Sequence, residues 1–367
     1  MRITHVVENL NRGGLERVVI DLALAQKAAG HDCRVVCLYE EGLLAGELRA
    51  EGIAVDACGK GTGFDVAALR RMRALFRAHG SEILHSHNII AHAYAALASR
   101  GIGMRRFLNT RHGRGVAPPG RMRLALYSIA MRWTDRVVAV CEAARRNLAE
   151  HDRVPAAKLA VVPNGIHVER FVAASSSAHR TVADLLGVGS GIEIIGFVGR
   201  LNWAKDLPTL IRAFAMLRRR GREAALALIG DGSLREELER LAADEGVGDR
   251  VVFLGDRSDV RNLLPGFDVF AMSSVSEGYS IALLEASASA LPIVATDVGG
   301  NAEIVSDGVS GRIVKPGDPA LFADALEDVL ADPARARAMG EAAIAWVRRE
   351  GSVETMVARY QTLYAET

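Results

Sequence analysis

One pattern constrains the fold of this chain more than any other: short apolar segments alternate with amphipathic segments, and the alternation starts again near residue 193. Each apolar segment ends at turn-forming residues, which is typical of buried strands followed by helices. The strands expected in the first series lie at residues 2–8, 32–39, 54–58, 83–87, 107–110, 137–140 and 159–162. Those expected in the second series lie at residues 193–198, 225–229, 251–254, 267–272, 293–296 and 311–314. The sequence therefore predicts an α/β fold with two parallel sheets, each covered by helices.

A small, polar and serine-rich segment at residues 172–180 separates the two series. Such a composition favours a flexible connection, so we expect this segment to link two domains. The N-terminal domain would then cover residues 1–170 and the C-terminal domain residues 171–349. A ligand site is expected between two such domains, because pockets often form there.

The segment from Ser274 to Ala286 has the most informative arrangement of polar residues. It joins an expected strand to a helix expected at residues 281–290, with Ser280 at the N-cap position. The unpaired N–H groups and the positive dipole end of such a helix favour a phosphate. Glu277 in the loop and Glu285 in the second helical turn would repel a phosphate, so we expect them to bind hydroxyl groups of a sugar and a ribose on either side of it. The alternative is that both glutamates are ordinary surface residues.

Two basic residues, Arg200 and Lys205, share the loop after the first strand of the second series. Arginine offers a forked donor and lysine a compact charge, and both stabilise the negative charge that develops on a leaving diphosphate. The sequence contains no Asp-x-Asp, and no carboxylate pair is spaced to hold Mg²⁺ under a diphosphate. We therefore expect no metal and no cofactor. The alternative is that Arg200 and Lys205 are solvated surface cations.

Charge is distributed unevenly along the chain, although the formal net charge is only +1. Residues 61–150 contain fifteen arginines and five acidic residues, an excess of ten positive charges that the rest of the chain offsets. The net charge argues against nucleic-acid binding. The basic N-terminal half, including residues 121–136, could contact an anionic membrane surface. The alternative is a solvated, arginine-rich face.

Polar residues also follow the expected strands of the first series. His87 and His112 each lie at a strand end, where ligands collect in open α/β sheets, so we expect them to be site residues. Gly13 and Gly14 lie in the loop after the first strand, where a backbone without side chains can approach a ligand. The dinucleotide fingerprint Gly-x-Gly-x-x-Gly is absent there, which argues against a dehydrogenase.

The compartment is indicated by the N-terminus and by the cysteines. Met1 is followed directly by a strand-like segment and not by a signal peptide. The four cysteines are expected to be reduced core residues, because none has a cluster of metal ligands around it. We therefore expect a cytoplasmic protein, located at the inner face of the membrane if the basic region contacts lipid.

Several of these segments together resemble the retaining glycosyltransferases of family 4, which have the GT-B fold. The resemblance rests on Gly13-Gly14-Leu15-Glu16, Asn164-Gly165, Gly199-Arg200, Lys205, Gly230-Asp231-Gly232, the Glu-x7-Glu spacing of Glu277 and Glu285, and Gly299-Gly300-Asn301-Ala302-Glu303. It covers essentially the whole chain. It implies two Rossmann-like α/β/α domains that face each other across a cleft, with the C-terminal helix at residues 350–367 packing back on the first domain.

The resemblance also implies a role for each matching residue. Glu277 would hold hydroxyl groups of the donor sugar, and Glu285 would bind the ribose of the nucleotide. Arg200 and Lys205 would hold the diphosphate, and His112 would lie near the transferred sugar and the acceptor. Further donor-binding positions would be Gly13, Gly14, Asn164, Gly230, Gly278, Tyr279, Ser280 and Ile281, with His87 and Arg111 on the acceptor side.

The implied reaction moves a sugar from a UDP- or GDP-sugar to an acceptor hydroxyl with retention of configuration and without metal. The acceptor would be a sugar or a lipid-linked group used to build a cell-surface polysaccharide or glycolipid. No carboxylate is clearly placed as a covalent nucleophile, so we expect attack from the face that the diphosphate leaves. Two alternatives stay open: a nucleotide-sugar epimerase of the same fold, and a non-catalytic subunit that binds a nucleotide sugar.

Overall fold

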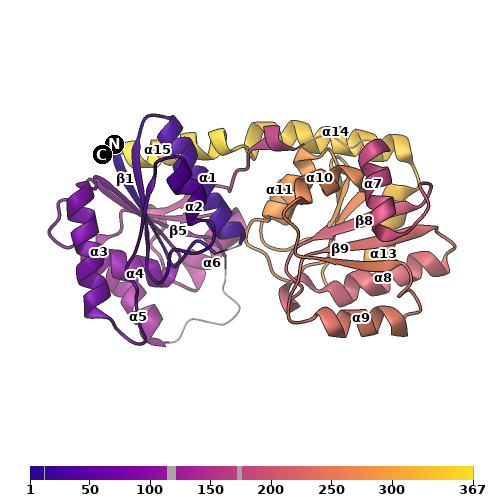
Figure 1. Ribbon diagram of the computed structural model, residues 1–367, viewed down its shortest axis with the longest axis horizontal. Helices are drawn as coiled ribbons and strands as arrows, with labels where there is room; N and C mark the ends of the chain where they lie inside the picture. The colour runs from indigo at the N-terminus through magenta and orange to yellow at the C-terminus, as the bar shows by residue number, and fades with distance from the viewer. Residues whose placement is uncertain (12, 114–120, 172–175, 367) are drawn as a thin grey trace. The chain divides into compact units, whose positions relative to one another are not determined.

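The computed structural model describes residues 1–11, 13–113, 121–171 and 176–366 (Figure 1). The chain divides into two compact units: Met1–Gly165 together with Val353–Thr367, and Ile166–Ser352. The division therefore lies at Gly165/Ile166 and Ser352/Val353, close to the expected boundaries at 170/171 and 349/350. Each unit contains one sheet of parallel strands with helices packed on it, so the predicted α/β fold is confirmed.

The first unit is built on a seven-stranded sheet with the order β3-β2-β1-β4-β5-β6-β7. Its strands are β1 (Arg2–Val7), β2 (Asp32–Cys37), β3 (Ala54–Ala57), β4 (Ile83–His87), β5 (Arg106–Arg111), β6 (Arg136–Ala139) and β7 (Leu159–Val161). Strands β1 and β4 are neighbours although three helices separate them in sequence, so the strand order reverses between them. Their register sets His5 directly opposite His85. In doubly wound sheets this point of reversal is where ligands bind.

Helices cover the sheet of the first unit, and one of them is the last helix of the chain. They are α1 (Gly14–Ala28), α2 (Ala45–Ala50), α3 (Val66–His79), α4 (Ile89–Ala98), α5 (Arg121–Ala130), α6 (Glu142–Glu150) and α15 (Val353–Ala365), with short 3₁₀ turns η1 (Met131–Trp133) and η2 (Ala156–Lys158). Helix α15 packs against α1 and buries Tyr360 and Tyr364 completely or nearly so. The amide Nε2 of Gln26 in α1 donates a hydrogen bond to the Tyr364 hydroxyl at 3.0 Å. The last helix of the chain is thus part of the first unit.

The second unit is built on a six-stranded sheet with the order β10-β9-β8-β11-β12-β13. Its strands are β8 (Glu193–Val198), β9 (Ala224–Ile229), β10 (Val251–Gly255), β11 (Val269–Met272), β12 (Ile293–Thr296) and β13 (Gly311–Val314). The central strands are buried on both faces, which explains their continuous apolar sequences. The strand order reverses between β8 and β11, which makes their carboxyl ends the expected ligand edge of this sheet.

The helices of the second unit include one, α7, in the segment that was expected to be a linker. They are α7 (Ser176–Leu186), α8 (Leu207–Arg219), α9 (Arg235–Asp244), α10 (Val260–Leu263), α11 (Ile281–Ala288), α12 (Asn301–Ile304), α13 (Pro319–Leu330) and α14 (Pro333–Glu350), with 3₁₀ turns η3 (Val168–Arg170), η4 (Trp203–Lys205) and η5 (Leu264–Gly266). The prediction of a linker at 172–180 is wrong from Ser176 onward, because α7 begins there and packs on η5. The other part of that segment, residues 172–175, lies outside the described residues.

No helix in the part of the chain that the structure describes is long and apolar enough to cross a membrane.

Candidate functional site

Three of the charged residues expected to bind the donor lie in two loops at the ligand edge of the second unit. The loop after β8 carries Arg200 and ends in η4 with Lys205, and the loop after β11 carries Glu277. Since β8 and β11 are neighbours at the point where the strand order reverses, both loops start at the same edge of the sheet. Residues far apart in sequence are brought together in this way.

Lys205 and Glu277 form the closest ionic contact of this edge. The Lys205 ammonium lies 2.5 Å from Oε1 of Glu277, and the two side chains are only 16% and 11% exposed. The hydroxyl of Ser274 donates a second hydrogen bond to the same oxygen at 2.6 Å. The sequence predicted different partners for Lys205 and Glu277, a phosphate and a sugar, and assigned no role to Ser274. In the structure, the Lys205 ammonium and the Glu277 carboxylate hold each other in place.

A set of hydrogen bonds between the two loops fixes this pair. The hydroxyl of Ser273 donates to the carbonyl oxygens of Lys205 and Asp206 at 3.0 and 2.9 Å. The N–H of Val275 donates to the carbonyl of Ala204 at 2.9 Å. Thr296, at the end of β12, donates through its hydroxyl to the carbonyl of Ser274 at 2.5 Å. Because these contacts involve backbone atoms on both sides, the loops after β8 and β11 are positioned as one structure.

Gly230 is needed where the loops after β8 and β9 meet. Its φ is +129°, and a Cβ built on it would lie 2.0 Å from the carbonyl oxygen of Gly199. The N–H of Gly199 donates in turn to the carbonyl of Ile229 at 2.9 Å. Any side chain at Gly230 would therefore push away the loop that carries Arg200.

Helix α11 begins where the resemblance implies a phosphate. Ser280 is its N-cap, and the serine hydroxyl accepts a hydrogen bond from the N–H of Leu283 at 3.4 Å. Ser280 and Tyr279 are nearly buried, which holds the start of the helix at the sheet edge. Glu285 lies half-buried in the second turn, and Arg200 is exposed at the end of β8. The helix ends at Ala288, two residues earlier than predicted.

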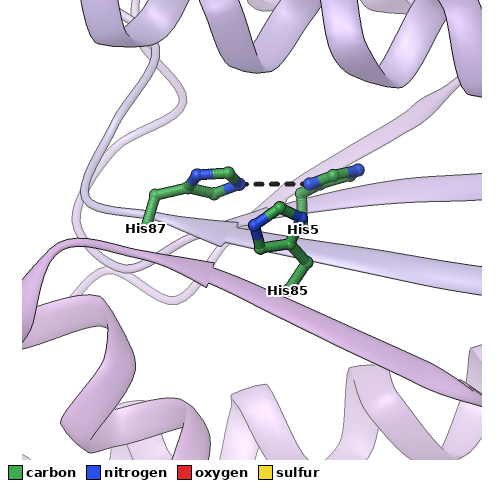
Figure 2. Close-up of side chains that lie close together, drawn as sticks. All are labelled: His5, His85 and His87. Atoms are coloured by element: carbon green, nitrogen blue, oxygen red, sulfur yellow. Dashed lines mark hydrogen bonds between the residues drawn. The ribbon is translucent and has the colours of Figure 1, made fainter. Parts of the chain in front are cut away.

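The first unit contains a second polar centre, at the corresponding edge of its own sheet. His5 lies on β1, and His85 and His87 lie on β4 and point to the same face, because they are two residues apart on a strand (Figure 2). Nδ1 of His5 lies 3.1 Å from Nε2 of His87, as the dashed line in Figure 2 marks. Nδ1 of His87 lies 3.0 Å from Nε2 of His112, which follows β5. The two histidines predicted from strand ends, His87 and His112, are therefore in direct contact.

His5, His85 and His87 are buried and His112 is half-buried, and the lowered pKa values of these four rings favour their neutral forms at pH 7. Burial lowers the pKa of His5 to about 4, although its hydrogen bond to Gln26 opposes the shift. Burial also lowers the pKa of His112 to about 4, against the opposing effect of the Asn164 side chain. Burial, and then the neighbouring histidines, lower the pKa values of His85 and His87 well below the usual value. A neutral imidazole has one donor and one acceptor nitrogen, so each ring in this centre has a direction.

The three histidines on β1 and β4 also raise the question of a metal. Nitrogen atoms of His5, His85 and His87 lie within 4.8 Å of one another. Both ring nitrogens of each histidine, however, already have a hydrogen-bond partner in the protein. A metal ion would have to break at least one hydrogen bond of every histidine, and this group offers it only neutral ligands. The geometry fits a hydrogen-bonded network better than a metal centre.

The other predicted site residues of the first unit have different surroundings. Arg111 is nearly buried. Its Nη1 lies 3.1 Å from Oδ2 of Asp152, and its guanidinium carbon lies 5.0 Å from the centre of the Tyr127 ring, so its contacts in this structure are with residues of the first unit. Asn164 is buried beside His112. Gly13 and Gly14 form the N-cap and first residue of α1.

Sequence reasoning missed His5, His85, Gln26 and Ser274. A signal for His5 and His85 was present, since a histidine within an apolar strand is a polar residue that must find a partner. Gln26 and Ser274 gave no comparable signal, because a polar residue on a helix or in a loop is usually solvated.

Comparisons with known proteins agree with the geometry. A family model described as "Glycosyltransferase Family 4" matches residues 12–170, and one described as "Glycosyl transferases group 1" matches residues 186–346. The chain is 34% identical over 308 residues to the GDP-mannose-dependent alpha-(1-6)-phosphatidylinositol monomannoside mannosyltransferase of Mycolicibacterium smegmatis, which covers 80% of this chain and 78% of the relative. It is 28% identical over 312 residues to the N-acetyl-alpha-D-glucosaminyl L-malate synthase of Bacillus anthracis, covering 82% and 79%.

A solved structure shares the fold over the full length of the chain. The crystal structure of HepE from Anabaena in complex with UDP superposes with a TM-score of 0.87, covering 100% of both chains at 22% sequence identity. That protein is similar in fold, and the two parallel sheets of this chain match structures of the GT-B type. With the two family models and a relative 34% identical over most of its length, the chain belongs to the family 4 glycosyltransferases, enzymes of the GT-B fold.

Proposed function

We propose that this glycosyltransferase moves a sugar from a UDP- or GDP-sugar to an acceptor hydroxyl with retention of configuration and without a metal. The observation that carries the proposal is the Lys205–Glu277 pair at the reversal of strand order, beside the start of α11. Names of similar proteins support the donor class: one relative is named as GDP-mannose-dependent, and a structure of similar fold holds UDP.

The diphosphate of the donor would occupy the N-terminal end of α11. Its first N–H groups have no partner within the helix, and they point toward the positive end of the dipole. Lys205 and Arg200 would supply the positive charge that a metal supplies elsewhere. Since the leaving diphosphate gains charge as the glycosidic bond breaks, these groups stabilise the transition state more than the ground state.

Glu277 and Glu285 would bind hydroxyl groups on the two sides of the diphosphate. Glu277 is held by Lys205 and Ser274 through one carboxylate oxygen, Oε1. The other oxygen, Oε2, would accept a hydrogen bond from the donor sugar. Glu285, one turn into α11, would accept hydrogen bonds from the ribose hydroxyls.

Transfer would proceed on the face that the diphosphate leaves. The bond between the anomeric carbon and the phosphate oxygen breaks, and the acceptor oxygen forms a bond to the same carbon. The acceptor proton passes to an oxygen of the leaving phosphate, so no protein base and no covalent intermediate is needed. Detection of a glycosyl–enzyme adduct by mass spectrometry would contradict this step.

The acceptor would be a sugar or lipid-linked group of a cell-surface polysaccharide or glycolipid, used at the cytoplasmic face of a membrane. The basic character of residues 61–150 and the phosphatidylinositol monomannoside named for one relative support this choice. Several arginines of that region have partners inside the unit: Arg71, Arg73, Arg100, Arg106, Arg111, Arg136 and Arg145. A membrane contact would therefore depend on the other arginines.

Arg200→Ala should lower kcat with little change in nucleotide affinity. Arg200 would act on charge that develops during transfer, and a charge-assisted hydrogen bond contributes roughly 1.5–3 kcal/mol, so we expect a decrease of about 10- to 100-fold. Steady-state kinetics and calorimetry with the nucleoside diphosphate separate the two quantities. A kcat equal to that of the wild type would remove Arg200 from the site.

Glu285→Ala should weaken binding of the nucleotide itself. Loss of the hydrogen bonds between the carboxylate and the ribose is expected to raise Kd for the nucleoside diphosphate by about 10- to 100-fold. Glu354, a glutamate near the start of α15 in the first unit, offers a matched control in Glu354→Ala. An unchanged Kd in Glu285→Ala would contradict the ribose assignment.

The proposal is tested by calorimetric titration with UDP, GDP, ADP and their common sugar conjugates in the presence of a chelator. We expect one nucleotide to bind well below millimolar concentration, and its sugar conjugate to be turned over with an acceptor. Failure of every nucleotide to bind would contradict the proposal. Binding without turnover would favour a non-catalytic subunit, and an epimerised sugar formed without acceptor would favour an epimerase.

A further inference from the structure

Asn88, the residue after β4, has a backbone conformation that few residues other than glycine adopt. Its φ is +61° and its ψ is −174°. Among the described residues, the other non-glycine residues with positive φ are Arg153, Asp206 and Ala290. Asp206, with φ +43° and ψ +49°, lies in the ordinary left-handed helical region, which asparagine and aspartate tolerate. The extended ψ of Asn88 places it outside that region, in a conformation that only glycine adopts without strain.

The side chain of Asn88 does not perform the local function that its position favours. Asn88 is the N-cap of α4, and an asparagine there ordinarily accepts a hydrogen bond from an N–H of the first helical turn. In this structure the side chain makes no capping hydrogen bond. Its Oδ1 instead accepts a hydrogen bond from the N–H of His112 at 3.3 Å. The backbone strain and the missing cap are therefore two costs that accompany the contact with His112.

Buried neighbours hold the strained backbone of Asn88 in place. Its N–H donates to the carbonyl of Thr110 at 2.9 Å, and Nδ2 of Asn109 donates to its carbonyl at 3.0 Å. Thr110 and Asn109 are completely buried on β5, and the hydroxyl of Tyr127 donates to Oδ1 of Asn109 at 3.1 Å. A strained conformation persists only where its surroundings determine it in this way, and such residues concentrate at functional sites.

Asn88 and the preceding residue, His87, hold His112 through different atoms. Nδ1 of His87 lies 3.0 Å from Nε2 of the His112 ring, whereas Oδ1 of Asn88 binds the backbone N–H. His112 directly follows β5, which lies beside β4, so both contacts are at the ligand edge of the first unit. A glycine at position 88 would adopt the same φ and ψ without strain, but it has no Oδ1. The contact with His112 is thus what asparagine adds over glycine.

We propose that Asn88 is a positioning residue of the acceptor side, whose side chain fixes the backbone of His112 at the cost of strain in its own backbone. The place of His112 beside the acceptor rests on the proposed function, whereas the contact between the two residues does not. The charged residues proposed to bind the nucleotide and its diphosphate belong to the second unit. Loss of the Asn88 side chain should therefore impair use of the acceptor and leave nucleotide binding unchanged.

The direct test is amide hydrogen exchange, measured by NMR on the full-length protein without substrate. In Asn88→Gly we expect the N–H of His112 to exchange about 5- to 10-fold faster than in the wild type, because its acceptor is removed. The N–H groups at the centre of β5, such as that of Leu108, should exchange as in the wild type. An unchanged exchange rate at His112 would overturn the proposal.

Two substitutions at position 88 separate the effect of the side chain from that of the strain. Asn88→Gly removes both, so its midpoint of chemical denaturation should equal or exceed that of the wild type. Asn88→Ala removes the contact but keeps the strain, so its midpoint should lie below that of Asn88→Gly. In both variants we expect kcat/KM for the acceptor to fall by about 10-fold, since small misplacements of a site residue have effects of this size. The Kd of the nucleoside diphosphate should not change.

A conservative variant and a matched control complete the experiment. Asn88→Asp keeps an oxygen acceptor and should restore the slow exchange of the His112 N–H. Arg153, in the same unit, is exposed and has φ +53°. Arg153→Gly therefore relieves left-handed strain without removing a contact to His112, and should keep the stability and the kcat/KM of the wild type or exceed its stability.

The outcomes distinguish this proposal from the proposed function. Normal acceptor kinetics in Asn88→Gly, together with faster exchange at His112, would overturn the positioning role. If the wild type transfers no sugar while exchange at His112 changes as expected, the proposed function is contradicted and the structural role of Asn88 is supported.

Discussion

Replacing Lys205 with alanine is expected to lower kcat by about 10²- to 10³-fold, the range seen when one preorganised donor to a developing negative charge is removed. The Lys205 side chain is only 16% exposed and already lies at the ligand edge, so it needs little reorganisation when the diphosphate leaves. Affinity for the nucleoside diphosphate should fall less than kcat. Steady-state kinetics with the nucleotide sugar, together with calorimetry, measure both quantities.

Controls separate this effect from a general loss of charge or structure. Lys315→Ala removes an exposed lysine that follows β13 in the same unit, and should leave kcat unchanged. Lys205→Arg keeps the charge and should recover part of the activity, because the guanidinium reaches a phosphate but not with the same geometry. If Lys205→Ala has a kcat within about threefold of the wild type, a difference of under roughly 0.7 kcal/mol, the lysine does not act on the leaving group.

Gly299→Ala is expected to lower the free energy of unfolding by about 2–5 kcal/mol and to displace Glu277, since it combines left-handed backbone strain with overpacking. Gly299 has φ +57°, and an added Cβ would lie 2.3 Å from the carbonyl oxygen of Glu277. The adjacent N–H of Gly300 donates to the carbonyl of Gly278 at 2.8 Å, so the added methyl group would separate the two loops where they meet. Chemical denaturation measures the loss of stability, and steady-state kinetics measures the loss of kcat that follows from the displacement of Glu277.

Gly308→Ala is the matched control, because it introduces the same backbone strain without a steric contact. Gly308 has φ +73°, and among the described residues no heavy atom outside its immediate neighbours lies within 4 Å of an added Cβ. We expect this variant to lower the free energy of unfolding by about 1–2 kcal/mol, the cost of the left-handed conformation alone, and to leave kcat unchanged. Equal losses of stability in the two variants, with normal activity in Gly299→Ala, would show that the contact with Glu277 does not position the site.

Much of the fold could be predicted because local patterns repeat. Buried parallel strands have continuous apolar sequences, so β8 to β13 and most of the first sheet were found close to their bounds. The N-cap of α11 was predicted from Ser280 alone, since its hydroxyl satisfies a helix N–H. Helix α7 was missed because its serine-rich start has the composition of a linker, and packing against η5 outweighs that preference.

The sequence predicted several residues of the candidate site, but it did not predict the contacts between them. Strand-end positions indicated Lys205, Glu277, His87 and His112, because topology brings strand ends to one edge. The pairing of Lys205 with Glu277 required the register of β8 and β11, whose paired residues Ile195 and Val269 are 74 positions apart in the sequence, and no local pattern contains that register. The buried histidines also depend on Gln26 in α1 and Tyr364 in α15, which hydrogen-bond to each other from opposite ends of the chain. This contact could not be predicted from either segment alone.

The most direct test of the account is the ¹H NMR spectrum of the product formed from the preferred nucleotide sugar and an acceptor, recorded with chelator present. The account predicts a glycosidic bond with the anomeric configuration of the donor, formed by the wild type and nearly absent with Lys205→Ala. A product with inverted configuration, or formation that stops when divalent metal is removed, would contradict it.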